Sequence, residues 1–246
     1  MTGSLYSNLK TDSSMVSIYE KSSNNIWKKL LNRQLKAIEG YACQEFLDGV
    51  QTLRDIMETI PDIDKLSARI DKLTGWKLYP VGGLIESEEY FNLLANKHFP
   101  VATVIRGADN LDYSPIPDYW HDIFGHIPLI LNRIYRDFVE FISREIVRAK
   151  ETDKEKLYTI YWYVIEAGVC RENGDLKVFG ASQLSSYGEI AYVFSDQPQI
   201  INFDLLKLCD TSVNIHEMQS TIYEITSLDY LKEIKPQIKR MLEHSK

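Results

Sequence analysis

Two histidines and one glutamate in this chain have the residue types and surroundings of a metal site. His121 and His126 lie five residues apart in the segment PDYWHDIFGHIPL, and Glu166 follows His126 by forty residues in the segment TIYWYVIEAG. Two neutral imidazoles and one carboxylate form the facial triad of non-haem Fe(II) oxygenases, which leaves other positions of the metal open. The three residues therefore predict a mononuclear iron centre that activates oxygen.

The pattern around Glu166 predicts that this carboxylate is buried. Leu157, Ile160 and Val164 recur at helical spacing on one face, and the face that carries Glu166 is also largely apolar or aromatic. A buried carboxylate without a partner is strongly unfavourable or takes up a proton. Glu166 therefore needs a metal, a hydrogen-bond network or a cation, and an arginine partner is the alternative to the metal.

The two histidines are a weaker signal when they are taken alone. Five residues correspond to about 140° around an ideal helix, so His121 and His126 would not share a face. Gly125 between them indicates that the helix is irregular there. Asp118 and Asp122 are close enough in sequence to accept hydrogen bonds from the imidazole N–H groups, as carboxylates near metal-binding histidines do.

The composition excludes several classes of protein. The chain has 246 residues, of which 44% are hydrophobic, and 28 basic residues against 35 acidic ones give a formal charge of -7. Nucleic-acid binding calls for clustered positive charge, so we expect no nucleic-acid partner. No segment has the length and hydrophobicity of a signal peptide or membrane span, so we expect no membrane association.

The three cysteines, Cys43, Cys170 and Cys209, are widely spaced and form no CxxC pattern. Neither a zinc cluster nor a disulfide framework is indicated. Free thiols are typical of a reducing compartment, and we expect the protein to be cytoplasmic.

Hydrophobic periodicity predicts one mainly helical domain with a few short strands. Polar, serine-rich residues 1–23 are expected to form a flexible tail, which leaves 24–246 as a single catalytic domain. The charged run 150–156 is expected to form a solvated turn. Residues 205–246 are expected to form weak helix and loop, which Pro236 interrupts. The expected helices lie near 26–38, 46–56, 63–73, 87–94 and 134–146, with strands near 76–84 and 101–105 and a hairpin at Asn173-Gly174.

Three motifs in fixed order resemble the pterin-dependent aromatic amino acid hydroxylases, and within them the bacterial phenylalanine hydroxylases. They are the pattern PxPDxxHDxxGHxPL, the segment YTIYWYVIEAGV and the segment FGASQLSSYGEIAY. The resemblance extends from about residue 76 to residue 194 without a gap. It implies a helical basket of one domain, with a few short strands, around a buried non-haem iron.

The resemblance also implies roles for individual residues. His121, His126 and Glu166 would bind Fe(II), and Arg106 would bind the substrate carboxylate, for which a guanidinium group is well suited. The residues expected to contact the amino acid are Arg106, Ser114, Pro115, Trp162, Ser185 and Glu189. The residues expected to contact the pterin are Gly83, Ile85, Tyr90, Asp122 and Tyr161.

The activity implied is ring hydroxylation of an aromatic amino acid by Fe(II), tetrahydrobiopterin or a related tetrahydropterin, and O2. Conversion of L-phenylalanine to L-tyrosine is favoured, with tryptophan or tyrosine as the alternative substrates. Two other hypotheses are an inactive pterin- or amino-acid-binding module and a zinc hydrolase, although no HExxH base accompanies the histidines. Nothing in the chain corresponds to the regulatory domain or the tetramer-forming helix of the animal enzymes, so we expect a monomer, with a dimer as the alternative.

Three positions depart from the family pattern. Family members commonly have an acidic residue at Ile116, a phenylalanine at Ala167 and a glycine at Ser182. Ala167 removes a ring beside the expected active site, and Ser182 adds bulk to the expected substrate wall. These departures bear on substrate choice more than on reaction type.

Overall fold

The computed structural model describes residues 15–112, 114, 116–214 and 217–244. Its α-helices are α1 (Ser23–Ala37), α2 (Gln44–Thr52), α3 (Arg54–Met57), α4 (Ile63–Thr74), α5 (Ser87–Ala95), α6 (Ile127–Ile130), α7 (Arg133–Arg148), α8 (Glu151–Tyr161), α9 (Ala181–Ser185), α10 (Tyr187–Val193), α11 (Leu205–Cys209) and α12 (Leu231–His244). Two π-helical turns, His121–His126 and Trp162–Glu166, and two 3-10 turns, Ala108–Asn110 and Leu228–Tyr230, complete the helical elements. The prediction of a mainly helical fold is confirmed.

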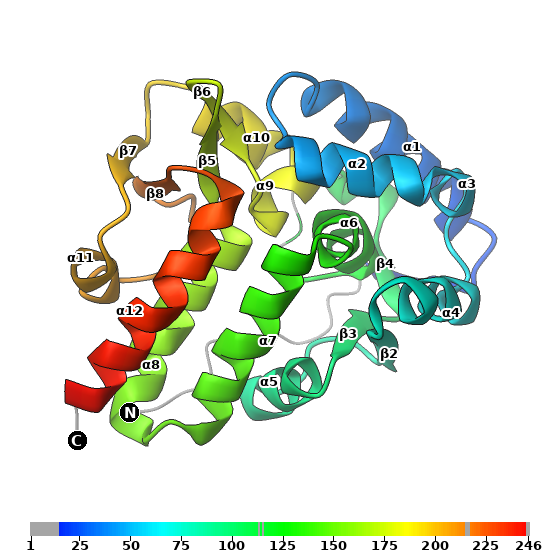
Figure 1. Ribbon diagram of the computed structural model, residues 1–246. Coiled ribbons are helices and arrows are strands. Elements are labelled where there is room, and N and C mark those ends of the chain that lie inside the picture. Colours follow the sequence, from blue (N-terminus) through cyan, green and yellow to red (C-terminus); the bar gives the residue numbers. More distant parts are fainter. Residues whose placement is uncertain (1–14, 113, 115, 215–216, 245–246) are drawn as a thin grey trace.

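The longest described helix, α7, lies at the centre of a group of helices. It packs against α5, α8 and α12, and Figure 1 shows α7, α8 and α12 running side by side. The buried face of α7 includes Tyr135, Phe138 and Ile142, which are spaced three or four residues apart, as one helical face requires. Packing of this apolar face, rather than helix propensity alone, stabilises the bundle.

The strands form three small sheets. They are β1 (Met15–Ser17), β2 (Lys77–Val81), β3 (His98–Ala102), β4 (Val104–Arg106), β5 (Val169–Glu172), β6 (Asp175–Val178), β7 (Gln199–Asn202) and β8 (Thr221–Ile225). β1 pairs with β4, β2 pairs in parallel with β3, and the largest sheet has the order β6-β5-β8-β7. The predicted hairpin is confirmed, because Asn173 and Gly174 connect β5 to β6 with positive φ angles of 53° and 90°.

Several expectations about individual segments are wrong. Part of the expected tail, residues 1–14, lies outside the described residues, but 15–23 contain β1 and the buried Ile18, so this part belongs to the fold. The charged run after Lys150 forms the first turns of α8, where Glu151 and Asp153 favour a helix N-terminus.

Two further errors concern the last forty residues. β8, whose residues were expected to form helix or loop, pairs with two other strands. Pro236 lies inside α12 and does not end it. Proline removes one backbone hydrogen bond, and the fully buried side chains of Leu231, Ile234 and Ile238 offset that loss by packing into the core.

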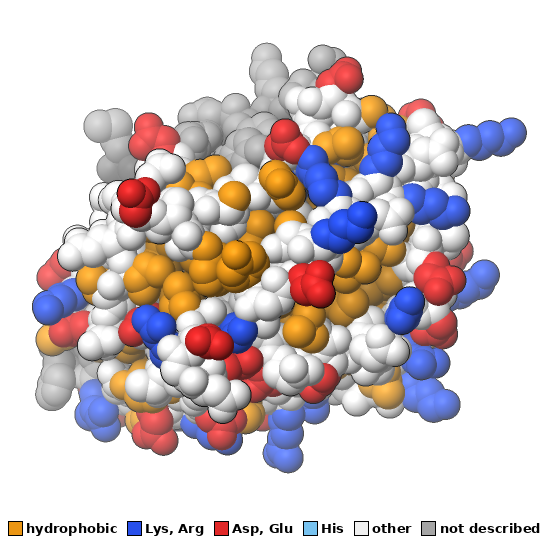
Figure 2. Space-filling model, turned by 90° about the horizontal axis from the view of Figure 1, so that it is seen from above, with side chains coloured by type: hydrophobic (Ala, Val, Ile, Leu, Met, Phe, Trp, Pro, Cys, Tyr) orange, Lys and Arg blue, Asp and Glu red, His pale blue; other side chains and the backbone are white. Residues whose placement is uncertain are grey.

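The surface seen in Figure 2 carries hydrophobic side chains in a band between basic and acidic groups. Among all described residues, the large hydrophobic side chains with the greatest exposure are Tyr19 and Leu206. None of the described helices has both the length and the hydrophobicity needed to cross a lipid bilayer.

Candidate active site

Two π-helical turns bring the candidate ligands together. His121 and His126 are the first and last residues of one π-turn, and Glu166 ends the other. Hydrogen bonds in a π-turn join residues five apart, as the Ala167 N–H does with the Trp162 carbonyl at 2.9 Å, so residues at that interval lie over one another. The expectation that the two histidines would not share a face is therefore wrong, because it assumed an ideal α-helix.

The three side chains converge on one point. His121 Nε2 lies 3.2 Å from His126 Nε2, and the Glu166 carboxylate lies 3.3 Å from His126 Nε2 and 3.5 Å from His121 Nε2. Metal–nitrogen bonds of about 2.1 Å at right angles would separate neighbouring ligand atoms by about 3 Å. The triad, with its nitrogen and oxygen donors, thus fits a single divalent ion such as Fe(II).

The protonation states also suit a metal. Burial alone would raise the pKa of Glu166, but the two histidines and Ser182 outweigh it and lower this pKa to about 2. Burial lowers the pKa of His121 to about 4, so its imidazole is neutral at pH 7. An ionised carboxylate beside a neutral imidazole is the state that metal binding requires.

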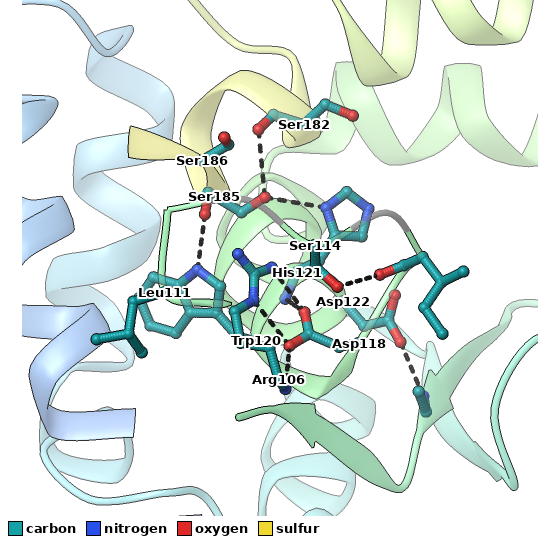
Figure 3. Close-up of polar contacts among 12 residues, drawn as sticks. Arg106, Leu111, Ser114, Asp118, Trp120, His121, Asp122, Ser182, Ser185 and Ser186 are labelled. Atoms are coloured by element: carbon teal, nitrogen blue, oxygen red, sulfur yellow. Dashed lines mark hydrogen bonds and ion pairs between the residues drawn. The ribbon is translucent and has the colours of Figure 1, made fainter. Parts of the chain in front are cut away.

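Ser185 on α9 fixes the orientation of His121, as Figure 3 shows. The Ser185 hydroxyl donates to the carbonyl of Ala181 at 2.8 Å, so it accepts the hydrogen bond from His121 Nδ1 at 2.9 Å. With the proton on Nδ1, the lone pair of His121 lies on Nε2, which faces the other two ligands. His126 Nδ1 is buried without a partner among the described residues, and its ring contacts Phe99.

α9 is held tightly against the segment that carries Glu166. Gln183 Nε2 donates to the Ala167 carbonyl at 3.2 Å, and the Ser182 hydroxyl donates to Glu166 Oε2 at 3.2 Å. A Cβ on Gly180 would lie 2.4 Å from the backbone nitrogen of Gly168, so only glycine permits this approach. The prediction that Ser182 only adds bulk is incomplete, because its hydroxyl also contacts Glu166. Serines three apart on a short helix could have indicated a shared face.

Arg106 and Asp118 form a buried ion pair beside this site (Figure 3). Arg106 Nε and Nη2 donate to the two Asp118 oxygens at 2.9 and 2.8 Å, and the Arg106 backbone N–H adds a third bond. Burial alone would raise the pKa of Asp118, but Arg106 outweighs it and holds this pKa below its usual value. Arg106 Nη1 is buried without a partner among the described residues, so it can donate to an anionic ligand.

The expectation that Asp118 and Asp122 accept from imidazole N–H groups is wrong. Asp118 accepts from the backbone N–H of His121, at 3.0 Å, and from Arg106. Asp122 accepts from the backbone N–H of Ala102 at 2.8 Å. Burial raises the pKa of Asp122 well above its usual value.

Some of the other expected site residues contact one another. The Tyr90 and Tyr161 hydroxyls lie 2.9 Å apart, and both rings pack on Phe91. Gly83, with a φ of 151°, and Ile85 lie in the loop between β2 and α5. No described hydrogen bond joins this loop to the metal-site triad.

Among the remaining expected residues, no side-chain hydrogen bond to the triad is described for Ser114, Trp162 or Glu189. The Ser114 hydroxyl donates to the Ile116 carbonyl at 2.7 Å, whereas Pro115 lies outside the described residues. Trp162 Nε1 is buried without a described partner. Burial and the nearby Glu166 raise the pKa of Glu189 to about 7.

A family model described as biopterin-dependent aromatic amino acid hydroxylase matches residues 4–245. The chain belongs to this family. The identification made from the three motifs is thereby confirmed, and with it the assignment as a pterin-dependent enzyme. The phenylalanine-4-hydroxylase of Pseudomonas aeruginosa is 36% identical over 225 residues, which cover 92% of this chain and 82% of the relative.

Solved structures of the family have the same fold. Phenylalanine hydroxylase from Legionella pneumophila gives a TM-score of 0.85 at 34% identity, with coverage of 96% of this hydroxylase and 95% of that chain. Phenylalanine hydroxylase from Chromobacterium violaceum, with bound iron(III) and 7,8-dihydrobiopterin, gives a TM-score of 0.85 at 32% identity. That comparison covers 97% of this chain and 90% of the other.

Proposed function

We propose that this chain is an Fe(II)- and tetrahydropterin-dependent monooxygenase that hydroxylates the ring of L-phenylalanine to give L-tyrosine. His121, His126 and Glu166 would hold the iron. The observation that carries the proposal is the convergence of these three side chains, with ligand atoms 3.2–3.5 Å apart. When bound, the iron and the pterin would supply the activation and reduction of O2, of which one atom would enter the ring and the other would be reduced.

The residues of the chain bind and orient the amino acid. The free Nη1 of Arg106 donates to the substrate carboxylate, while Asp118 fixes the rest of the guanidinium group. Ser114, Pro115, Ser185 and Glu189 line the amino-acid end, and Trp162 packs against the ring. Because Arg106 is held rigidly and buried, little side-chain entropy is lost when the substrate binds.

The proposed binding site of the pterin is beside the loop that contains Gly83 and Ile85. Tyr90, Tyr161 and Asp122 flank it from neighbouring elements. The paired tyrosine hydroxyls and the buried Asp122 carboxyl offer hydrogen-bonding groups to a heterocycle that carries both donors and acceptors.

The test is aerobic incubation of the purified chain with Fe(II), a tetrahydropterin and, separately, phenylalanine, tyrosine or tryptophan. We expect tyrosine from phenylalanine, in a reaction that needs both Fe(II) and the pterin. If only tryptophan were hydroxylated, phenylalanine would be refuted as the substrate. Product formation without iron would refute the proposed chemistry.

We also propose that the chain from Met15 onward forms one catalytic domain, which works as a monomer in the cytoplasm. The burial of Cys43 and Cys170 as free thiols suits a reducing compartment. Light scattering of the purified chain tests the monomer, and a mass twice that of the 28.5 kDa chain would refute it.

A further inference from the structure

Ser182 places a hydroxyl next to the candidate metal site. It is the second residue of α9. Its hydroxyl donates to Glu166 Oε2 at 3.2 Å. Since an ionised carboxylate can only accept hydrogen bonds, the proton of this contact comes from Ser182.

The two oxygens of Glu166 have different surroundings. Oε1 lies 3.3 Å from His126 Nε2 and accepts no described hydroxyl. Oε2 lies 3.5 Å from His121 Nε2 and also accepts from Ser182. A hydroxyl on one oxygen of a carboxylate occupies a lone pair there and leaves the other oxygen as the better ligand.

The hydroxyl of Ser182 is held in place by the rest of α9. One turn along the helix, Ser185 contacts His121, so two hydroxyls of one short helix each contact a candidate ligand. Gln183 binds the backbone immediately after Glu166, and Gly180 lies against the same segment. Ser182 and Glu166 are thus fixed relative to each other.

We propose that Ser182 is a positioning residue that holds Glu166 Oε2 off the metal, so that Glu166 binds through Oε1 alone. This inference rests on the iron site of the proposed function. A second carboxylate oxygen on the metal would take one of the positions that a facial triad leaves open for other ligands. The hydroxyl therefore preserves open positions at the metal, and its loss should reduce kcat.

The test uses Co(II) in the full-length chain, because its visible absorption weakens as its coordination number rises. Ser182→Ala and Ser182→Gly remove the hydroxyl, and Ser182→Thr keeps it. Ser143→Ala is the control, since this buried serine in α7 donates only to the Val139 carbonyl of its own helix. Spectra are compared at one bound Co(II) per chain, as established by titration calorimetry.

We expect Ser182→Ala and Ser182→Gly to lose visible intensity, whereas Ser182→Thr and Ser143→Ala match the wild type. In the iron enzyme, Ser182→Ala should lower kcat by about tenfold and leave the KM for the amino acid unchanged. An unchanged Co(II) spectrum in Ser182→Ala would overturn the inference, and so would a Ser182→Thr spectrum like that of Ser182→Ala. A wild-type chain that bound no Co(II) would instead refute the proposed metal site itself.

Discussion

At the scale of single residues, the site depends on pairs in which one polar group orients another. Ser185 orients His121, Ser182 contacts Glu166, and Asp118 holds Arg106. All three contacts join residues that are at least 12 positions apart in the sequence. The candidate ligands could be named from the sequence because their types are restrictive, whereas the contact between Ser182 and Glu166 could not, because a serine three residues from another serine has many uses.

The Arg106–Asp118 pair should contribute strongly to stability. Asp118→Asn would leave a buried guanidinium group without its charged partner, which should lower the free energy of unfolding at pH 7 by about 3–5 kcal/mol. Because the folded pKa of Asp118 is lowered, its contribution is present above the unfolded value near 4 and is lost as the pH falls through the folded pKa.

Urea unfolding at several pH values measures this contribution. The difference between wild type and Asp118→Asn should be largest near neutral pH and shrink on acidification. Asp229→Asn is the control, because Asp229 pairs with Lys232 on the surface and should contribute less than about 1 kcal/mol. Equal effects of the two substitutions would contradict the account.

Ala167 is expected to influence the choice of aromatic ring. It is buried directly after Glu166, and Gln183 binds its carbonyl. If the small side chain leaves room beside the ring, Ala167→Phe should reduce tryptophan turnover more than phenylalanine turnover, by about 1–3 kcal/mol in relative kcat/KM. Comparing the ratio of the two kcat/KM values cancels any general loss of active protein. An unchanged ratio would show that Ala167 does not face the substrate.

At the scale of elements, the helices and strands were largely predictable, but the shape of the two ligand-bearing turns was not. Regular helices such as α4 and α7 follow directly from hydrophobic spacing. A π-turn follows no such repeat, because its hydrogen bonds depend on the packing of the whole segment. The same holds for Pro236, whose helical conformation is decided by tertiary contacts rather than by local sequence. In β8, by contrast, the β-branched and aromatic residues were a local strand signal that the prediction missed.

The close packing of α9 predicts that Gly180 cannot be replaced. In Gly180→Ala the new Cβ would lie 2.4 Å from Gly168 N and 2.6 Å from the Glu166 carbonyl, so backbone must move. We expect the midpoint of chemical unfolding to fall, with a loss of about 1–3 kcal/mol, and metal affinity to fall as well. Gly188→Ala in α10 is the control, because its Cβ would be at an ordinary distance of 3.5 Å from Met218. Full stability in Gly180→Ala would contradict the described packing.

At the scale of the whole molecule, the core encloses groups that would otherwise react. Cys43 and Cys170 are fully buried, and Cys209 is partly exposed. Burial raises the pKa of Cys170 to about 12 and that of Cys209 to about 11. The thiolate is the nucleophile. About one Cys209 thiol in a thousand is ionised at pH 8, and this fraction grows as the pH rises toward 11.

Labelling with a thiol reagent tests this burial. Cys209 should be modified first and slowly, at a rate that increases with pH, and all three thiols should react rapidly in denaturant. Cys209→Ser should abolish the early phase. Modification of Cys43 in the folded protein as fast as that of Cys209 would contradict the described core.

The central claim is that segments forty residues apart in sequence form one iron site. Anaerobic titration with Fe(II), followed by calorimetry, measures its stoichiometry in the wild type and in His121→Ala, His126→Ala and Glu166→Ala, with His98→Ala as the control. His98 is suitable because the described contacts of its side chain are with Asn96 and Tyr79, away from the triad. The account predicts one Fe(II) per chain in the wild type and the control, and loss of stoichiometric binding in each triad variant while circular dichroism shows the fold retained. A folded His126→Ala chain that still bound one Fe(II) with wild-type affinity would contradict it.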